Sequence, residues 1–268
     1  MDRLPNYSFD SLSIMSLNIR FDDVNEKGPL SWENRSKVLE RLFRFAKPDI
    51  ICLQEVASLE GVNIVTSRPT EWIDRGLNEY GWIGRESHDD FPQPIPILYL
   101  SNRFSISEDG YQLLPLVEDQ NFQYQRRVVW ARIYDTVSEQ HFYVYNTHLR
   151  PGIDLNTVQA RERSALKIIE LLNSRSFRDP VILTGDMNAV SFTNTIRSFE
   201  GVLKDVQPRN RSGTYHGFLG LPLLPKIDYI FVSPNIVILD ASILTFNIDG
   251  IFPSDHYPIS AQLLFAEK

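Results

Sequence analysis

The sequence predicts an α/β fold in which mixed β-sheets are covered by helices on their outer faces. Strand-like and helix-like segments alternate along the chain, and the strands outnumber the helices, with several strands following one another directly. A purely parallel sheet would need a crossover, usually helical, between consecutive strands, so this order favours a mixed sheet system. No Gly/Ser-rich linker, internal repeat or low-complexity tract divides the chain, so we expect one domain over residues 1–268.

Three helices are predicted from apolar residues that recur at helical spacing. The first covers residues 32–46, with Ser31 as the expected N-cap and Pro48 as the residue that ends it. The other two cover residues 70–78 and 156–172.

Strands are predicted where short apolar or alternating runs are bounded by turn-forming residues. Residues 50–53 form an uninterrupted apolar run, which is typical of a buried strand. The Pro- and Gly-rich segments 91–96 and 217–225 are predicted to be ordered surface loops. The predicted strands cover residues 13–18, 50–53, 96–100, 127–133, 142–147, 180–184, 227–232, 237–241 and 259–264.

Composition excludes some classes of protein. The net charge of −7 argues against a protein that binds duplex DNA mainly by neutralising phosphates, because such proteins are usually basic. The single cysteine, Cys52, lies in an apolar run, where we expect a buried and inert thiol, and one cysteine allows no intrachain disulfide. No apolar run reaches membrane-spanning length and no signal-peptide pattern precedes Asn18, so we expect a cytoplasmic protein without membrane contact. We also expect a monomer.

Polar residues with catalytic potential stand at the ends of the predicted strands, where a rigid sheet can hold them in place. Any one of them alone would be read as a turn, a cap or an ordinary surface residue. Their coincidence at so many strand ends is what predicts a functional site. The residues are Asn18, Glu55, His148, Asp186, Asn188, Asp228, Asp255 and His256.

This set suits metal-assisted hydrolysis of a phosphoester. Mg²⁺ prefers oxygen ligands, which Glu55, Asp255 and Asn18 can supply. Asp186 can orient or deprotonate the attacking water, and Asn188, two residues later, can donate to a phosphate oxygen.

A histidine and an aspartate complete the set. His256 can contact a phosphate if the imidazole is charged, and a carboxylate partner would keep it charged. Asp228 is the candidate for that partner.

The chain resembles the endonuclease/exonuclease/phosphatase superfamily, which has the DNase-I-like fold. The shared motifs run almost from end to end: Leu17–Arg20, Leu53–Glu55, Ile97–Tyr99 with Arg103–Phe104, Asn146–Leu149, Gly185–Ala189, Lys226–Phe231 and Ser254–Pro258. Two further segments, Ser31–Arg35 and Gly213–Phe218, are similar to a largely uncharacterised branch of small metal-dependent hydrolases within it.

The resemblance implies a four-layer α/β sandwich, with two mixed β-sheets packed face to face and helices outside. It also implies Mg²⁺ or Mn²⁺ near Glu55, with Asn18 and Asp255 helping to fix the metal. Asp186 would handle the nucleophilic water, with Asn188 beside it.

The remaining roles that the resemblance implies concern the phosphate. His256 and Asp228 would form a hydrogen-bonded pair, and His148 would be a second phosphate contact. Tyr99 matches an active-site tyrosine of several relatives. Arg126 matches an arginine near the phosphate, with the neighbouring Arg127 as the alternative, since adjacent strand residues face opposite sides.

The sequence departs from the superfamily pattern at one position. Relatives often carry Glu six residues before the position of Tyr99, where it orients the histidine that matches His148, whereas this chain has Gln93. A Gln oxygen can accept the imidazole proton but cannot stabilise an imidazolium as a carboxylate can. Either His148 works as a neutral ring, or an acidic residue within 86–90 takes the place of the glutamate.

We therefore expect a Mg²⁺-dependent phosphoesterase that hydrolyses a phosphodiester or phosphomonoester bond. Its expected partner is a phosphorylated small molecule or a single-stranded nucleic acid, which the acidic net charge favours over duplex DNA. Nuclease, deadenylase-like exonuclease, nucleotide phosphatase and inositol or lipid phosphate hydrolase all stay open. A non-catalytic binding protein that keeps the fold is the alternative from another class, and the intact set around Asp186 and His256 argues against it.

Overall fold

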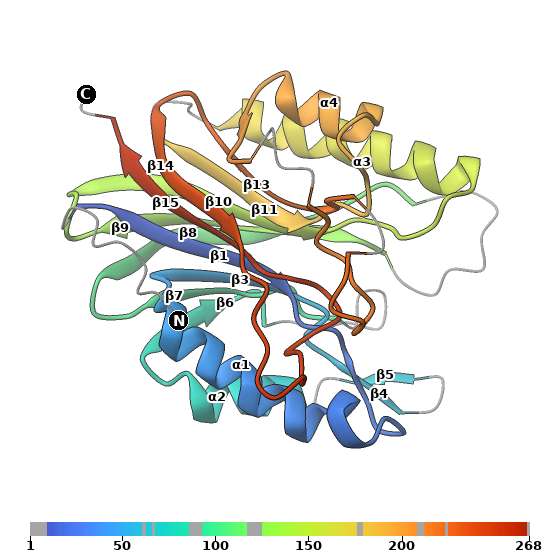
Figure 1. The fold of residues 1–268 in the computed structure, drawn as a ribbon. Helices are drawn as coiled ribbons and strands as arrows, with labels where there is room; N and C mark the ends of the chain where they lie inside the picture. Colours follow the sequence, from blue (N-terminus) through green and yellow to red (C-terminus); the bar gives the residue numbers. More distant parts are fainter. Residues whose placement is uncertain are drawn as a thin grey trace.

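The computed structural model describes residues 10–60, 63–65, 68–85, 93–116, 125–175, 179–207, 212–222 and 225–266. Within these residues the chain forms two six-stranded mixed sheets, a small three-stranded sheet and four α-helices (Figure 1).

The first sheet is built around two parallel neighbours. Strand β1 pairs in parallel with β3 and antiparallel with β15, so the sheet is mixed. Its order is β14 (Ile236–Ile243), β15 (Ile259–Phe265), β1 (Leu12–Asn18), β3 (Ile50–Gln54), β7 (Ile97–Leu100) and β6 (Tyr80–Ile83).

The second sheet repeats this plan. Strands β10 and β11 are its parallel neighbours, and both are flanked by antiparallel strands. Its order is β12 (Lys204–Asp205), β13 (Asp228–Val232), β11 (Val181–Asp186), β10 (Gln140–His148), β9 (Arg127–Asp135) and β8 (Phe104–Leu113). The small sheet consists of β2 (Asp22–Asp23), β4 (Ser58–Glu60) and β5 (Asn63–Val65).

Helices cover the outer faces of the two large sheets (Figure 1). Helices α1 (Trp32–Ala46) and α2 (Arg68–Gly76) pack on the first sheet, with a short 3₁₀ helix, Gly28–Leu30, leading into α1. Helices α3 (Leu155–Ser174) and α4 (Asn194–Glu200) pack on the second.

Three apolar clusters define the layers. One lies between the sheets and draws on strands of both, including Ile14, Ile97, Val144 and Ile230. The other two lie between each sheet and its own pair of helices. Helix, sheet, sheet and helix therefore form four layers, which confirms the predicted α/β sandwich. The one-domain organisation stays a prediction.

The helix predictions agree closely with the structure. Helix α1 covers 32–46 as expected, α2 begins two residues earlier than the predicted 70–78, and α3 extends the predicted 156–172 at both ends. Ser31 stands at the N-cap of α1, but its hydroxyl donates to the Gly28 carbonyl instead of accepting a helix N–H.

Several elements were not predicted, among them β6, β8, α4 and the very short strands β2, β4, β5 and β12. Strand β8 is the outermost strand of its sheet and is largely exposed, so its polar sequence shows no apolar period. Strand β6 and helix α4 are short, and their pattern is too brief to be distinctive. Among the described helices, none combines the length and apolarity that crossing a membrane requires.

Candidate metal-dependent phosphoesterase site

The parallel strand pairs bring the candidate residues together. Strands β1 and β3 lie in register and end at Asn18 and Gln54, directly before Glu55. Strands β10 and β11 also lie in register, and their last residues, His148 and Asp186, are paired. Strand β11 contacts both β1 and β3 across the sandwich, so the four strand ends meet at one edge.

Glycine is required directly before Asp186. A Cβ atom at Gly185 would lie 2.0 Å from the carbonyl oxygen of Thr147 on the neighbouring strand. Only glycine allows this close approach, and its φ of 150° lies in the region that L-residues avoid. Glycine is therefore required at the first position of the Gly-Asp-Met-Asn motif because no side chain fits there. The close approach of the two strands fixes the position of Asp186 at the end of β11.

Asn18 holds two carboxylates together. Its side-chain amide donates to Glu55 Oε1 at 3.0 Å and to Asp186 Oδ2 at 3.1 Å. The other Glu55 oxygen accepts the N–H of Phe21 at 3.1 Å. Asp186 Oδ1 accepts the N–H of Asn188 at 2.9 Å. Each carboxylate is therefore held through both of its oxygens.

Three residues at this edge have left-handed backbone conformations. The φ values are 58° at Arg20, 59° at Glu55 and 46° at Asn188, and none of the three is glycine. Non-glycine residues in this region cost free energy and cluster at functional sites, where the surrounding structure holds them in place. The backbone conformation therefore sets the directions of the Arg20, Glu55 and Asn188 side chains.

His256 and Asp228 form the hydrogen-bonded pair that the sequence predicts. Nδ1 of His256 lies 2.9 Å from Asp228 Oδ2, and both side chains are buried. Nε2 of His256 lies 3.9 Å from Asp186 Oδ2. Burial lowers the pKa of His256, but the adjacent carboxylates of Asp228, Asp186 and Asp255 outweigh it and raise the pKa to about 10. His256 is therefore a cation at neutral pH.

Replacing Asp228 by asparagine is expected to lower the pKa of His256 from about 10 toward its ordinary value of 6.5. Because the folded-state pKa lies above the ordinary value, the pair stabilises the protein fully below pH 6.5, and this contribution is lost as pH rises through about 10. Imidazole NMR shifts of the metal-free protein measure this pKa directly. A value that stays near 10 in Asp228→Asn would contradict the assignment, and Asp179→Asn serves as a remote control.

Asp186 is a buried carboxylate in an unfavourable environment. It lies directly opposite Asp228 on the neighbouring antiparallel strand. Burial and the Asp228 charge raise the pKa of Asp186 to about 7, against the opposing effect of His256. Like charges facing each other in a sheet are destabilising, so a functional reason is expected for this arrangement.

His148 differs from His256 in its protonation. Its Nε2 lies 3.5 Å from Asp186 Oδ2 and 3.9 Å from Glu55 Oε1, while its Nδ1 has no hydrogen-bond partner among the described residues. Burial, Arg126 and His256 hold the pKa of His148 well below 6.5, so the ring is neutral. Of the two readings of His148, this geometry favours the neutral one, whereas the acidic residues of 86–90 lie outside the described residues.

Arg126 is electrostatically coupled to the cluster. Burial lowers the pKa of Arg126, the carboxylates of Glu55 and Asp186 raise it, and the cation of Arg150 lowers it further. The alternative, Arg127, lies over the Tyr111 ring at 5.7 Å. Arg126 is therefore the better candidate for a phosphate contact.

Tyr99 does not join the cluster. It pairs with Ile50 at the beginning of β3, whereas Glu55 follows the end of that strand. Five residues of extended chain span about 16 Å, so Tyr99 lies beside the beginning of β3, about 16 Å along the strand from Glu55. Its ring packs against the core between the sheets, and burial raises its pKa. The prediction of Tyr99 as a site residue is corrected by the antiparallel direction of β7.

Several residues of the site escaped sequence reasoning. Ser254 donates its hydroxyl to the Asn18 carbonyl at 2.6 Å and accepts the His256 N–H at 3.2 Å. Thr214 Oγ1 accepts the N–H groups of Ile227 and Asp228. These contacts join positions far apart in the chain, so only their presence in the shared motifs could have signalled them.

Arg20 is a further residue that sequence reasoning did not single out. Its guanidinium lies 3.2 Å from a Glu26 oxygen and 3.6 Å from Asp255 Oδ2. A cation therefore already stands beside the carboxylate that was predicted to bind metal, and it holds Asp255 near the end of β1.

The chemistry of the donors fits a divalent cation. Four carboxylates converge at this edge, from Glu55, Asp186, Asp228 and Asp255. Burial and the charge of Glu55 raise the pKa of Asp255, although His256, Arg20 and Arg35 oppose this effect. A bound metal ion relieves the mutual repulsion of carboxylates that are buried together.

Within the described residues, one compact group of potential ligands comprises Asp186, Asp228 and His256, whose donor atoms lie within 4.8 Å of one another. A protonated histidine cannot ligate a metal, and the His256–Asp228 pair is already satisfied internally. In this group the His256–Asp228 hydrogen bond pairs two of the three members, whereas the oxygens of Glu55 and Asp255 are of the kind that Mg²⁺ prefers.

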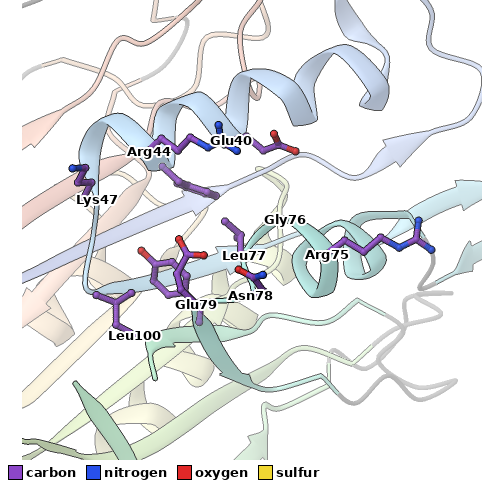
Figure 2. A pocket seen from close by; sticks show the side chains of 11 residues that line it. Glu40, Arg44, Lys47, Arg75, Gly76, Leu77, Asn78, Glu79 and Leu100 are labelled. Atoms are coloured by element: carbon purple, nitrogen blue, oxygen red, sulfur yellow. The ribbon is translucent and has the colours of Figure 1, made fainter. Parts of the chain in front are cut away.

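A separate cavity of about 720 Å³ lies between α1 and α2 (Figure 2). Its rim carries acidic and basic side chains, among them Glu40, Arg44, Lys47 and Glu79. No candidate site residue lines it. The site is therefore distinct from this cavity.

Comparison with known proteins agrees with this fold. A model of the Endonuclease/Exonuclease/phosphatase family matches residues 15–256. No curated protein gives a significant match.

Solved structures share the fold. An endonuclease/exonuclease/phosphatase family protein from Bacteroides thetaiotaomicron is 24% identical, with a TM-score of 0.82 over 97% of this chain and 100% of that one. The mannosyl-6-phosphatase of the same organism is 23% identical, with a TM-score of 0.77 over 95% and 100%. TDP2 from D. rerio, complexed with a single-strand DNA product, is 17% identical, with a TM-score of 0.71 over 94% and 98%. The family match spans most of the chain, and the protein therefore belongs to the Endonuclease/Exonuclease/phosphatase family.

Proposed function

We propose that this protein is a divalent-metal-dependent phosphoesterase that hydrolyses a phosphodiester or phosphomonoester bond. The observation that carries the proposal is the position of Asp186. Its carboxylate is bonded to Asn18 on one side and lies beside the charged His256 on the other. A candidate base, a carboxylate cluster and a cation thus meet at one edge of the sandwich.

Glu55 and Asp255 would hold the metal, with Asn18 as the third contributor. Asn18 positions Glu55 through its side-chain amide, and its Oδ1, which accepts the Arg20 N–H at 2.9 Å, keeps a second lone pair. Mg²⁺, or alternatively Mn²⁺, supplies charge neutralisation at the phosphoryl oxygens when bound.

Asp186 would orient the attacking water and take its proton. Both of its oxygens accept hydrogen bonds, from Asn18 and from the N–H of Asn188, so the carboxylate has a fixed direction. A raised pKa, about 7, makes it a stronger base than an ordinary aspartate at neutral pH.

Besides the metal and Asp186, charged and neutral hydrogen-bond donors would bind the phosphate. His256, kept cationic by Asp228, neutralises developing negative charge, and the neutral His148 can donate one hydrogen bond. Arg126 adds a second cation. Asn188 uses its side-chain amide to donate to the Leu149 carbonyl at 3.1 Å, so one of its amide protons stays available for the substrate.

The substrate class that we propose is a phosphorylated small molecule or a single-stranded nucleic acid. Structural relatives include a mannosyl-6-phosphatase and a protein complexed with a single-strand DNA product, which supports phosphorylated substrates of both kinds. The acidic net charge argues against duplex DNA as the preferred partner.

Hydrolysis should depend on a divalent metal ion. The test is a screen of purified protein with Mg²⁺ and Mn²⁺ against labelled single-stranded RNA and DNA, nucleotides, sugar phosphates and inositol phosphates. We expect chelation to reduce the rate by at least about a hundredfold and either metal ion to restore it. Full activity after thorough chelation would overturn the metal requirement. A metal-loaded protein that hydrolyses none of these esters would instead support a non-catalytic binding role.

A further inference from the structure

A charged side chain is completely buried next to the site without serving in it. The Arg35 guanidinium has no exposed surface and donates to five backbone carbonyls. The distances range from 2.8 Å to Leu30 and Ile19, through 2.9 Å to Phe21 and 3.3 Å to Arg20, to 3.4 Å to Pro253.

Arg35 has no ion-pair partner in contact among the described residues. Burial lowers the pKa of Arg35 to about 10, and the nearby charges of Glu26, Asp255 and Asp22 act against that effect. The side chain is therefore still a cation at neutral pH. A buried charge is costly unless its hydrogen bonds are well satisfied, so the carbonyl contacts need an explanation beyond packing.

Four of the five carbonyls belong to two segments that carry site residues, and the fifth, that of Leu30, ends the 3₁₀ helix before α1. Ile19, Arg20 and Phe21 directly follow Asn18 at the end of β1. Pro253 stands two residues before Asp255, and 218 positions separate it from Arg35. One planar guanidinium thus bridges the two segments that supply Asn18 and Asp255, two of the three residues proposed to hold the metal.

The segment Gly213–Phe218 contacts the chain around Pro253 and Asp255 from the side opposite Arg35. The N–H groups of His216 and Gly217 donate to the Asp255 carbonyl at 2.9 and 3.1 Å. The Phe218 ring lies 5.8 Å from the Arg35 guanidinium, and the Trp32 ring lies 5.4 Å from it. The two motifs that mark the hydrolase branch therefore enclose one turn from opposite sides.

We propose that Arg35 is a positioning residue that sets the spacing between two segments. One follows Asn18 and holds Glu55 through the Phe21 N–H at 3.1 Å, and the other carries Asp255. The Arg35 guanidinium contacts five carbonyls at once, with the two N–H groups of Nη1 shared among three of them, which a lysine ammonium with three donors cannot reproduce. The inference rests on the proposed function, since it assigns Arg35 to the metal half of that same site.

The test compares Arg35→Lys with Arg103→Lys. Arg103 is a matched control because its guanidinium bonds the Ser11 carbonyl and Asp135, near the opposite end of β1. For Arg35→Lys we expect Mn²⁺ affinity and kcat each to fall about ten- to a hundredfold, with KM nearly unchanged. Arg103→Lys should lower the melting temperature but leave Mn²⁺ affinity and kcat within about twofold.

Chemical rescue separates positioning from general stability. We expect Arg35→Ala to regain about tenfold in Mn²⁺ affinity when millimolar guanidinium is added, because the ion can occupy the vacated site between the carbonyls. A folded Arg35→Lys protein that binds Mn²⁺ as tightly as wild type would overturn the proposal, as would an equal loss in Arg103→Lys.

Mn²⁺ binding is measured without turnover, so the two proposals can fail separately. If the wild-type protein binds Mn²⁺ but hydrolyses no phosphoester, the proposed function fails and the comparison of the variants still decides the role of Arg35. If the wild-type protein binds no Mn²⁺, both proposals are overturned.

Discussion

Replacing Asp186 by asparagine is expected to lower kcat by about a hundred- to ten-thousandfold, the range associated with loss of a general base. Asparagine keeps the shape of the side chain and can accept one of the two hydrogen bonds that Asn18 and Asn188 now donate. It cannot take a proton from water. Single-turnover hydrolysis of a phosphodiester at saturating Mg²⁺ measures the effect.

The same substitution should leave the fold intact. Asp186 is buried opposite Asp228, so removing its charge relieves repulsion that offsets the lost hydrogen bond. We expect the melting temperature of the metal-free protein to change by less than about 4 °C, which corresponds to about 1 kcal/mol. Asp179→Asn, which breaks the 2.9 Å ion pair with Arg132 before β11, is the matched control and should keep its activity. A folded Asp186→Asn protein with normal activity would refute the assigned role.

Replacing Glu55 by glutamine should weaken metal binding by at least about tenfold, the lower end of the loss seen when a partner outside the direct ligands is replaced. The substitution keeps an oxygen that can accept the Phe21 N–H, so the left-handed turn at Glu55 can persist. What it removes is the negative charge that a hard cation prefers. Calorimetric titration with Mn²⁺ and the Mg²⁺ concentration that gives half-maximal activity both measure the effect.

A neighbouring carboxylate provides the control for Glu55→Gln. Glu26 is ion-paired with Arg20 at 3.2 Å but contacts none of the other carboxylates of the site in the described structure. Glu26→Gln should therefore keep metal affinity within about twofold. Equal losses in the two variants would show that the general electrostatic field, and not Glu55 itself, governs binding.

Local pattern was sufficient for much of the fold. The helix at 32–46 has a wide apolar stripe and was predicted with its observed bounds. The apolar strands that line the core between the two large sheets were also predicted. Strand β8 was missed because it lies at the edge of its sheet and faces solvent along most of its length. Its strand conformation comes from pairing with β9, which leaves no local signature.

For the site, local sequence pattern likewise placed some residues correctly and misplaced another. Residues at the ends of buried parallel strands, such as Asn18, His148 and Asp186, were predicted and lie together in the structure, because chain direction and register carry them to one edge. Tyr99 was misplaced because the direction of a strand is not visible in its own sequence. The antiparallel pairing of β7 with β3 places Tyr99 beside the beginning of β3.

Chemical identity and spacing along the chain therefore indicated which groups are available: a candidate aspartate base, candidate carboxylate donors and a histidine with an acidic partner. Tertiary structure decided their states. Two buried histidines from similar strand ends differ because Asp228 keeps His256 charged, whereas burial, Arg126 and His256 leave His148 neutral. The contacts of Arg35 were also decided there, since its five acceptors are backbone carbonyls that any sequence would supply. Hydrogen bonds and charges act through space, so only the folded chain reveals which of them meet.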